Sequence, residues 1–93
     1  MPSRSEILDT AKQAVNVDRA ATHGDAERNF DLIAGYWSTH LGVPVSALDV
    51  AVMMMLLKVA RIRSNPAHVD SFVDVAGYAA CGGEIATAQS EAA

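Results

Sequence analysis

Two carboxylates stand one helical turn apart in the stretch HVDSFVDVAGYAACGG, which covers residues 68–83. At about 100° per residue, a helix here places Asp70, Asp74, Gly77 and Cys81 within an arc of about 60° on an otherwise nearly apolar surface. Carboxylates at this spacing can both reach a hard cation such as Mg²⁺, which commonly bridges to substrate phosphates. The spacing therefore indicates a magnesium site for a phosphate-bearing ligand. The structural alternative is that Asp70 stabilises the helix N-terminus while Asp74 faces water.

Gly77 and Cys81 leave room beside these carboxylates. Glycine has no side chain and cysteine has a small one, so a ligand or a neighbouring helix can approach the backbone closely. This side of the helix is therefore compatible with a ligand groove and with close helix packing.

Further candidates lie on the preceding segment. Asp49 serves either as a third metal ligand or as the acidic residue of a capping box begun by Ser46. Lys58 and Arg61, three residues apart, either contact phosphates or pair with the two aspartates near the turn that joins the helices. Pairing is the simpler of these two interpretations.

Two more residues are candidates for contact with a nucleotide. His23, in a polar loop, can orient a ligand, although a lone loop histidine is usually a surface residue. Tyr78 can stack on a base, although at helical spacing it is more simply a core aromatic. The sequence contains no Ser, His and acid spacing, no glycine-rich phosphate loop and no zinc pattern. Nucleophilic catalysis therefore has no support.

Start and stop signals divide the chain into four helical segments. The first begins with Ser3 and Glu6 in capping-box spacing and continues to residue 15. The second has Asp25 as its expected N-cap and ends near Gly42 and Pro44. The first is expected to bury Ile7, Leu8, Ala11, Ala14 and Val15, and the second Phe30, Ile33, Ala34, Trp37 and Leu41.

The third segment runs from its N-cap Ser46 to about Ile62 and is apolar all round between residues 50 and 57. Such a helix should be surrounded, either by the other three helices or by another subunit. For the fourth segment, Asn65 is the expected N-cap and Pro66 the first helical residue. Gly82 and Gly83 loosen or stop it, and residues from about 85 to 93 form a frayed tail.

Length and composition favour one all-α domain covering residues 1–93, a four-helix bundle-like fold. The chain is 51% hydrophobic but only 5% aromatic, which suits closely packed helices. A chain of 93 residues buries only about two thirds of its unfolded surface, so oligomerisation would help to complete its core.

Charge and cysteine content exclude several classes of protein. The net charge is −4 and only seven residues are Lys or Arg, which argues against a nucleic-acid surface. A single cysteine rules out an internal disulfide framework and fits a reducing compartment. No apolar run reaches the roughly 20 residues of a membrane span, and MPSRSEILDT lacks the apolar core of a signal peptide. We expect a cytoplasmic protein without a membrane partner.

The stretches HGDAERNFDLIAGYW and DVAVMMMLLKVARIRSNPAHVDSFVDVAGYAA resemble a family of short phage and prophage proteins of unknown function. That family is similar to the MazG-like all-α nucleoside triphosphate pyrophosphatases, and the likeness covers about residues 5–84. The resemblance implies a helical bundle, usually a dimer or tetramer, that binds Mg²⁺ through acids on two adjacent helices. It further implies hydrolysis of a nucleoside triphosphate to the monophosphate and pyrophosphate, in the host cytoplasm if the protein is phage-encoded.

The two acidic motifs of that superfamily are matched unequally. Asp70 and Asp74 match the second motif, whereas the first, with two adjacent Glu and a third one turn later, is matched by Asp49 alone. Phosphoanhydride hydrolysis needs cations on the phosphates and a group that activates water. A complete site would therefore need Glu27, Asp31 or a neighbouring subunit.

Three hypotheses follow. The first is a Mg²⁺-dependent nucleotide pyrophosphohydrolase with Asp70 and Asp74 as catalytic residues, Asp49 as a further metal ligand, and Lys58 or Arg61 on the phosphates. The second is a non-catalytic homo-oligomer that sequesters a nucleotide or cyclic-nucleotide signal. The residues that would bind it are Lys58, Arg61, Tyr78 and His23. The third is a helical assembly protein without a ligand.

Overall fold

The regular structure of the described residues is helical, and the helices are joined by short turns. The structure is a computed structural model and describes the backbone of residues 1–18 and 26–92. Within these residues there is no strand. The elements are α1 (Arg4–Gln13), a π-helical turn η1 (Ala14–Asp18), α3 (Ala26–Leu41), α4 (Ala47–Ser64) and α5 (Val69–Ala92). The prediction of an all-α fold with four main helices is confirmed.

Serine side chains cap two of the helices, as the sequence predicts. Ser3 Oγ accepts a hydrogen bond of 3.1 Å from the Glu6 N–H at the start of α1. Ser46 Oγ accepts one of 3.0 Å from the Asp49 N–H, and the Asp49 carboxylate accepts one of 2.9 Å from the Ser46 N–H. Each cap satisfies N–H groups that lack a partner within the helix and contributes about 1 kcal/mol.

A short connection fixes the start of α4 against the end of α3. Gly42 has a φ of 72° and donates its N–H to the Ser38 carbonyl at 2.9 Å, so a glycine ends α3 as expected. Ser38 Oγ accepts from the Val45 N–H at 2.8 Å and donates to the Val45 carbonyl at 3.2 Å. These bonds hold the two helix ends together. The predicted N-cap of α3, Asp25, lies outside the described residues.

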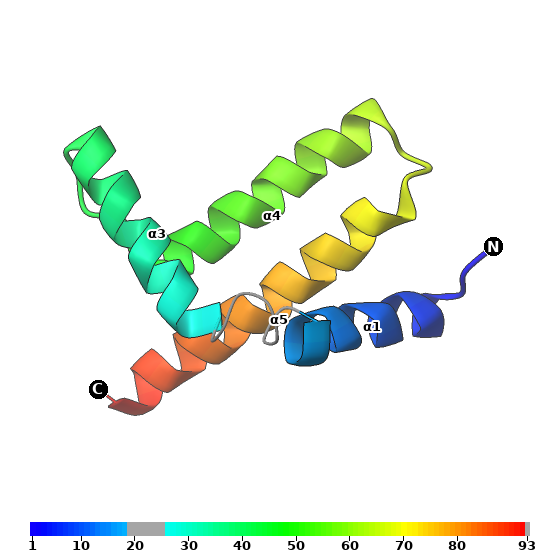
Figure 1. The fold of residues 1–93 in the computed structure, drawn as a ribbon, viewed down its shortest axis with the longest axis horizontal. Helices are drawn as coiled ribbons and strands as arrows, with labels where there is room; N and C mark the ends of the chain where they lie inside the picture. Colours follow the sequence, from blue (N-terminus) through cyan, green and yellow to red (C-terminus); the bar gives the residue numbers. More distant parts are fainter. Residues whose placement is uncertain (19–25, 93) are drawn as a thin grey trace.

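Helices α4 and α5 form an antiparallel hairpin (Figure 1). Asn65 is the C-cap of α4 and donates its N–H to the Arg61 carbonyl at 2.8 Å, so the prediction that Asn65 is an N-cap was wrong. Pro66 lies in the turn, and α5 begins three residues later at Val69. The His68 N–H donates to the Asn65 carbonyl at 3.1 Å, which closes the turn before the next helix starts.

Helix α5 continues past Gly82 and Gly83 to Ala92, although the sequence predicts that these glycines loosen or end it. A Cβ atom added at Gly82 would lie 3.1 Å from Cβ of Ala51, so this glycine brings α5 close to α4. Residues 85–92, predicted to fray, lie in the helix, and Ile85 is buried. Packing against α4 outweighs the low helix propensity of glycine here.

The core lies where α3, the first half of α4 and α5 meet. Phe30 of α3 and Val50 of α4 are almost completely buried. The buried cluster consists of Phe30, Ala34, Ala47, Val50, Ala51, Tyr78 and Ile85. Leu8 and Leu41, both predicted to face inward, are exposed because α1 packs along one face of α5 and the last turn of α3 extends beyond the core.

The outward face of α4 is not covered by the other helices. Its second half runs beside α5 toward the turn (Figure 1), where Lys58 pairs with Asp74. The exposed apolar side chains of this helix are Val52, Met53, Leu56, Leu57 and Val59. The other three helices therefore do not surround the apolar middle of α4. Among the described residues, no helix combines the length and hydropathy needed to cross a membrane.

Candidate functional site

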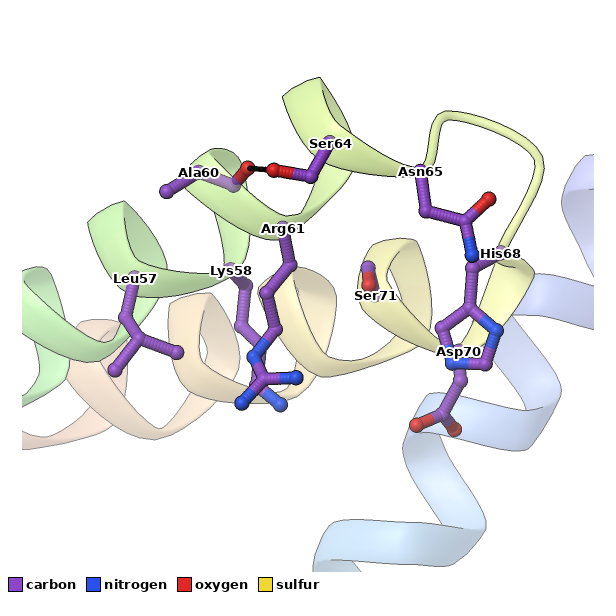
Figure 2. A pocket seen from close by; sticks show the side chains of 9 residues that line it. All are labelled: Leu57, Lys58, Ala60, Arg61, Ser64, Asn65, His68, Asp70 and Ser71. Atoms are coloured by element: carbon purple, nitrogen blue, oxygen red, sulfur yellow. Dashed lines mark hydrogen bonds between the residues drawn. The ribbon is translucent and has the colours of Figure 1, made fainter.

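A hollow lies at the turn between α4 and α5, and we call it the turn pocket (Figure 2). It has a volume of about 610 Å³ and is open to solvent. The last two turns of α4 form one wall, and the first turn of α5 forms the other. It is lined by Leu57, Lys58, Ala60, Arg61, Ser64, Asn65, His68, Asp70 and Ser71.

An ion pair crosses between the two walls beside this pocket. Lys58 Nζ of α4 lies 2.9 Å from Oδ2 of Asp74 on α5, and the two side chains are 19% and 30% exposed. The pairing that the sequence offers as the simpler interpretation is therefore confirmed for Lys58 and Asp74. It also means that a protein ammonium group already neutralises the Asp74 carboxylate.

Arg61 lies one turn closer to the end of α4 and points toward the α5 side, as Lys58 does (Figure 2). Among the described residues, no carboxylate lies within ion-pairing distance of its guanidinium group. A guanidinium group carries five N–H donors in a planar fork that matches a phosphate group. Arg61 is thus available for an anion that enters the turn pocket.

Neutral polar groups complete the wall near the turn. Ser71 is buried on α5, and its N–H donates to the His68 carbonyl at 3.2 Å. Ser64 Oγ donates to the Ala60 carbonyl at 3.3 Å (Figure 2). Ser64, His68 and Ser71 were not chosen as site residues from the sequence, because they come from two helices and the turn between them, so no helical spacing brings them together.

Asp70 and Asp74 lie in different surroundings although they are one turn apart. Asp70 is exposed in the turn pocket, and its carboxylate points away from α4 (Figure 2). Asp74 pairs with Lys58 and lines a second hollow of about 40 Å³ between the N-terminal segment and α5. The two carboxylates therefore do not line the same pocket.

The small residues on the same line of α5 face the N-terminal segment. A Cβ atom added at Gly77 would lie 3.1 Å from Cγ1 of Val15. Cys81 lines the same small hollow as Val15 and Gly77. Gly77 thus permits close packing of η1 on α5. This supports helix packing, and not a ligand groove, as the reason for the small residues Gly77 and Cys81.

Asp49 lies apart from the other two predicted metal ligands. Its carboxylate caps α4, and it precedes Lys58 by nine residues, which is about 14 Å along a helix. Among the described residues, no group of three or more His, Cys, Asp or Glu side chains is placed to hold a metal ion. One chain therefore does not bring Asp49, Asp70 and Asp74 together.

The two remaining candidates are placed as follows. Tyr78 is only 8% exposed, and its ring centroid lies 6.1 Å from that of Phe30, at an interplanar angle of 31°. It is a core aromatic, so its ring is not presented to a base. His23 lies outside the described residues.

The sequence of this chain is similar to those of two phage proteins. The chain is similar to the "Gene 55 protein" of Mycobacterium phage L5, with 49% identity over 74 residues that cover 78% of this chain and 47% of the relative. It is also similar to the "Gene 55 protein" of Mycobacterium phage D29, with 40% identity over 75 residues that cover 81% and 50% of the two chains. The chain thus spans about half the length of these curated relatives. No solved structure matches it.

The resemblance to phage proteins of unknown function is confirmed by these relatives. Residues 6–86, which include every element of the turn pocket, match a family described as "Domain of unknown function (DUF6378)". The match covers most of the chain, so the chain belongs to the DUF6378 family.

Proposed function

We propose that this domain binds a nucleotide through its phosphate groups in the turn pocket, without a need for metal. The observation that carries the proposal is the guanidinium of Arg61, which has no carboxylate partner among the described residues and lies beside the Lys58 ammonium group. The pocket volume of about 610 Å³ falls within the usual range of small-molecule sites, about 300 to 1,000 Å³.

The lining of the pocket divides into a part for phosphates and a part for the rest of the ligand. Arg61 and Lys58 supply charge-assisted donors, which are the stronger class of hydrogen bond. Leu57 and Ala60 supply apolar surface on the same wall, suited to a sugar or base edge. This division matches a nucleotide better than free inorganic phosphate.

Mg²⁺-dependent pyrophosphohydrolysis is the second candidate function. It is favoured by Asp70, which lines the turn pocket, and by the MazG-like resemblance of the sequence. Mg²⁺ usually keeps several waters and takes one or two carboxylates, so Asp70 is a plausible single ligand. Hydrolysis would further require that Asp74 leave Lys58, or that a second chain supply Asp49, Glu27 or Asp31.

A thermal-shift panel tests nucleotide binding. The panel holds nucleoside triphosphates, monophosphates, cyclic nucleotides and inorganic phosphate, each with Mg²⁺ or with EDTA. A ligand at 100 times its Kd stabilises the native state by about 2.7 kcal/mol, so we expect a rise in Tm with nucleotides in EDTA. Arg61→Ala should abolish the rise, whereas Arg28→Ala, which removes an exposed arginine of α3 outside the pocket, should keep it. If Tm does not change with any ligand, the proposal is overturned, and the remaining hypothesis is a helical assembly protein that binds no ligand.

Asp74→Asn separates binding from hydrolysis. If Lys58 binds phosphate, removal of the competing carboxylate should tighten nucleotide binding in EDTA. If Asp74 is a catalytic metal ligand, the same variant should abolish Mg²⁺-dependent release of pyrophosphate. Turnover by the unmodified protein that is lost in Asp74→Asn would therefore replace our proposal with the pyrophosphohydrolase.

A further inference from the structure

The outward face of α4 carries an apolar seam with a charged residue at each end. Val52, Leu56 and Val59 are 42%, 61% and 51% exposed although they lie in the middle of a long helix. Asp49 precedes this group by three residues and Arg63 follows it by four, and both are exposed. These five residues are the α4 seam.

The α4 seam has the spacing of a helix–helix contact. Its residues follow one another at intervals of three, four, three and four, which is the repeat of a coiled-coil seam. Asp49 and Lys58 are nine residues apart, a rotation of about 180° at roughly 100° per residue. Because Lys58 faces α5, the seam lies on the opposite side of α4. A second helix can therefore lie there without displacing α5.

The opposite charges at the two ends of the seam favour a second copy of this chain in antiparallel orientation. In an antiparallel pair with its two-fold axis at Leu56, Asp49 of one chain lies opposite Arg63 of the partner subunit, seven residues from the axis in each direction. Such a pair would form two ion pairs, one at each end of the apolar centre. A parallel pair would instead place like charges opposite each other.

We propose that the α4 seam is a self-complementary docking surface for a second copy of this chain, in antiparallel orientation. This inference goes beyond nucleotide binding and does not depend on it. A single-helix seam is small beside a standard interface of about 800 Å² per partner. The dimer should therefore dissociate on dilution.

Sedimentation velocity over a range of protein concentrations tests the association. The unmodified chain should pass from monomer to dimer as the concentration rises. Leu56→Glu places two negative charges at the two-fold axis and should weaken association by at least about tenfold. Leu32→Glu is the matched control, because Leu32 is 56% exposed on α3 and lies outside the seam. A chain that stays monomeric at every concentration, or equal loss in both variants, would overturn the proposal.

Cysteine cross-linking tests the orientation. In a Cys81→Ser background, Leu56→Cys should form an intermolecular disulfide under oxidising conditions, because the two copies of residue 56 meet at the axis. Val52→Cys and Arg63→Cys should not cross-link to themselves. Self-cross-linking at residues 52 and 63 would indicate a parallel pair and contradict the proposed arrangement.

A charge exchange tests the end pairs. Arg63→Asp places a carboxylate opposite the partner's Asp49 and should weaken association. The double variant Asp49→Arg with Arg63→Asp restores opposite charges and should recover it, with thermal unfolding used to check that loss of the Ser46 capping box leaves the chain folded. Failure of the double variant to recover association in a folded chain would count against this register.

Discussion

The two ends of the α4–α5 hairpin are held together by different physical means. Next to α3, Ala51 meets Gly82 and buried side chains fill the space between the helices. Next to the turn, an ion pair between Lys58 and Asp74 crosses from helix to helix, and an open pocket adjoins it. Stability therefore resides at the α3 end, whereas the turn end presents exposed polar groups to a ligand.

Loss of a core side chain at the α3 end should reduce stability most. Phe30 is 3% exposed and packs on Tyr78, so Phe30→Ala should lower the free energy of unfolding by about 3 to 5 kcal/mol. Phe72→Ala is the control, because Phe72 is 42% exposed near the turn end, and it should cost less. Urea unfolding followed by circular dichroism measures both. If both variants lose the same free energy of unfolding, the two ends of the hairpin do not differ in stability.

Next in size is the contact between Gly82 and Ala51. Gly82→Val should destabilise the chain by about 1 to 3 kcal/mol, because the added side chain must displace α4. At the neighbouring Gly83, a Cβ atom meets nothing within 4 Å, so Gly83→Ala should raise stability by about 0.5 to 1 kcal/mol through helix propensity. Midpoints of chemical unfolding compare the two. A neutral Gly82→Val would show that the helices separate easily there.

The ion pair at the turn end should contribute less. Lys58 and Asp74 are partly exposed, so their coupling energy should be about 1 kcal/mol or less. A double-mutant cycle with Lys58→Met and Asp74→Asn measures it directly. Salt should reduce this coupling, since exposed charges are screened. A coupling as large as the loss in Phe30→Ala would mean that the turn end is also a site of stability.

The smallest effect on stability should come from Arg61. It is exposed and makes no ion pair with the described residues, so Arg61→Ala should change the free energy of unfolding by less than about 0.5 kcal/mol. The same variant should lose nucleotide binding, and binding to the unmodified chain should weaken as salt is raised. Isothermal titration at two salt concentrations checks this. Binding that is insensitive to salt would argue against a phosphate contact.

Local signals in the sequence predicted much of the fold. The serine caps at Ser3 and Ser46 and the stop at Gly42 depend on residues within one turn, so spacing alone locates them. Asn65 and Pro66 carry an equally good start signal, but the chain uses them to end α4 and close a turn. A local pattern cannot choose between two adjacent helix ends that compete for the same residues.

The candidate site was predicted in part. The choice of Lys58, Arg61 and Asp70 identified three residues of the turn pocket, on both of its walls, from charge and spacing. The sequence could not tell that Asp74 would turn to Lys58 while Asp70 stayed in the pocket, because this depends on the rotation of α5 against α4. Tyr78 was a candidate for stacking on a base, with a core aromatic as the simpler interpretation, and its contact with Phe30 places it in the interior.

Ala60 lies on the border between two surfaces, since it lines the turn pocket and sits on the same side of α4 as Leu56 and Arg63. If a molecule held against one surface touches Ala60 or a chain held against the other surface, the two binding free energies are coupled. Thermodynamic linkage makes such an influence reciprocal. A nucleotide that favours the paired chains would be bound more tightly by them in equal measure, so the response to ligand would depend on protein concentration.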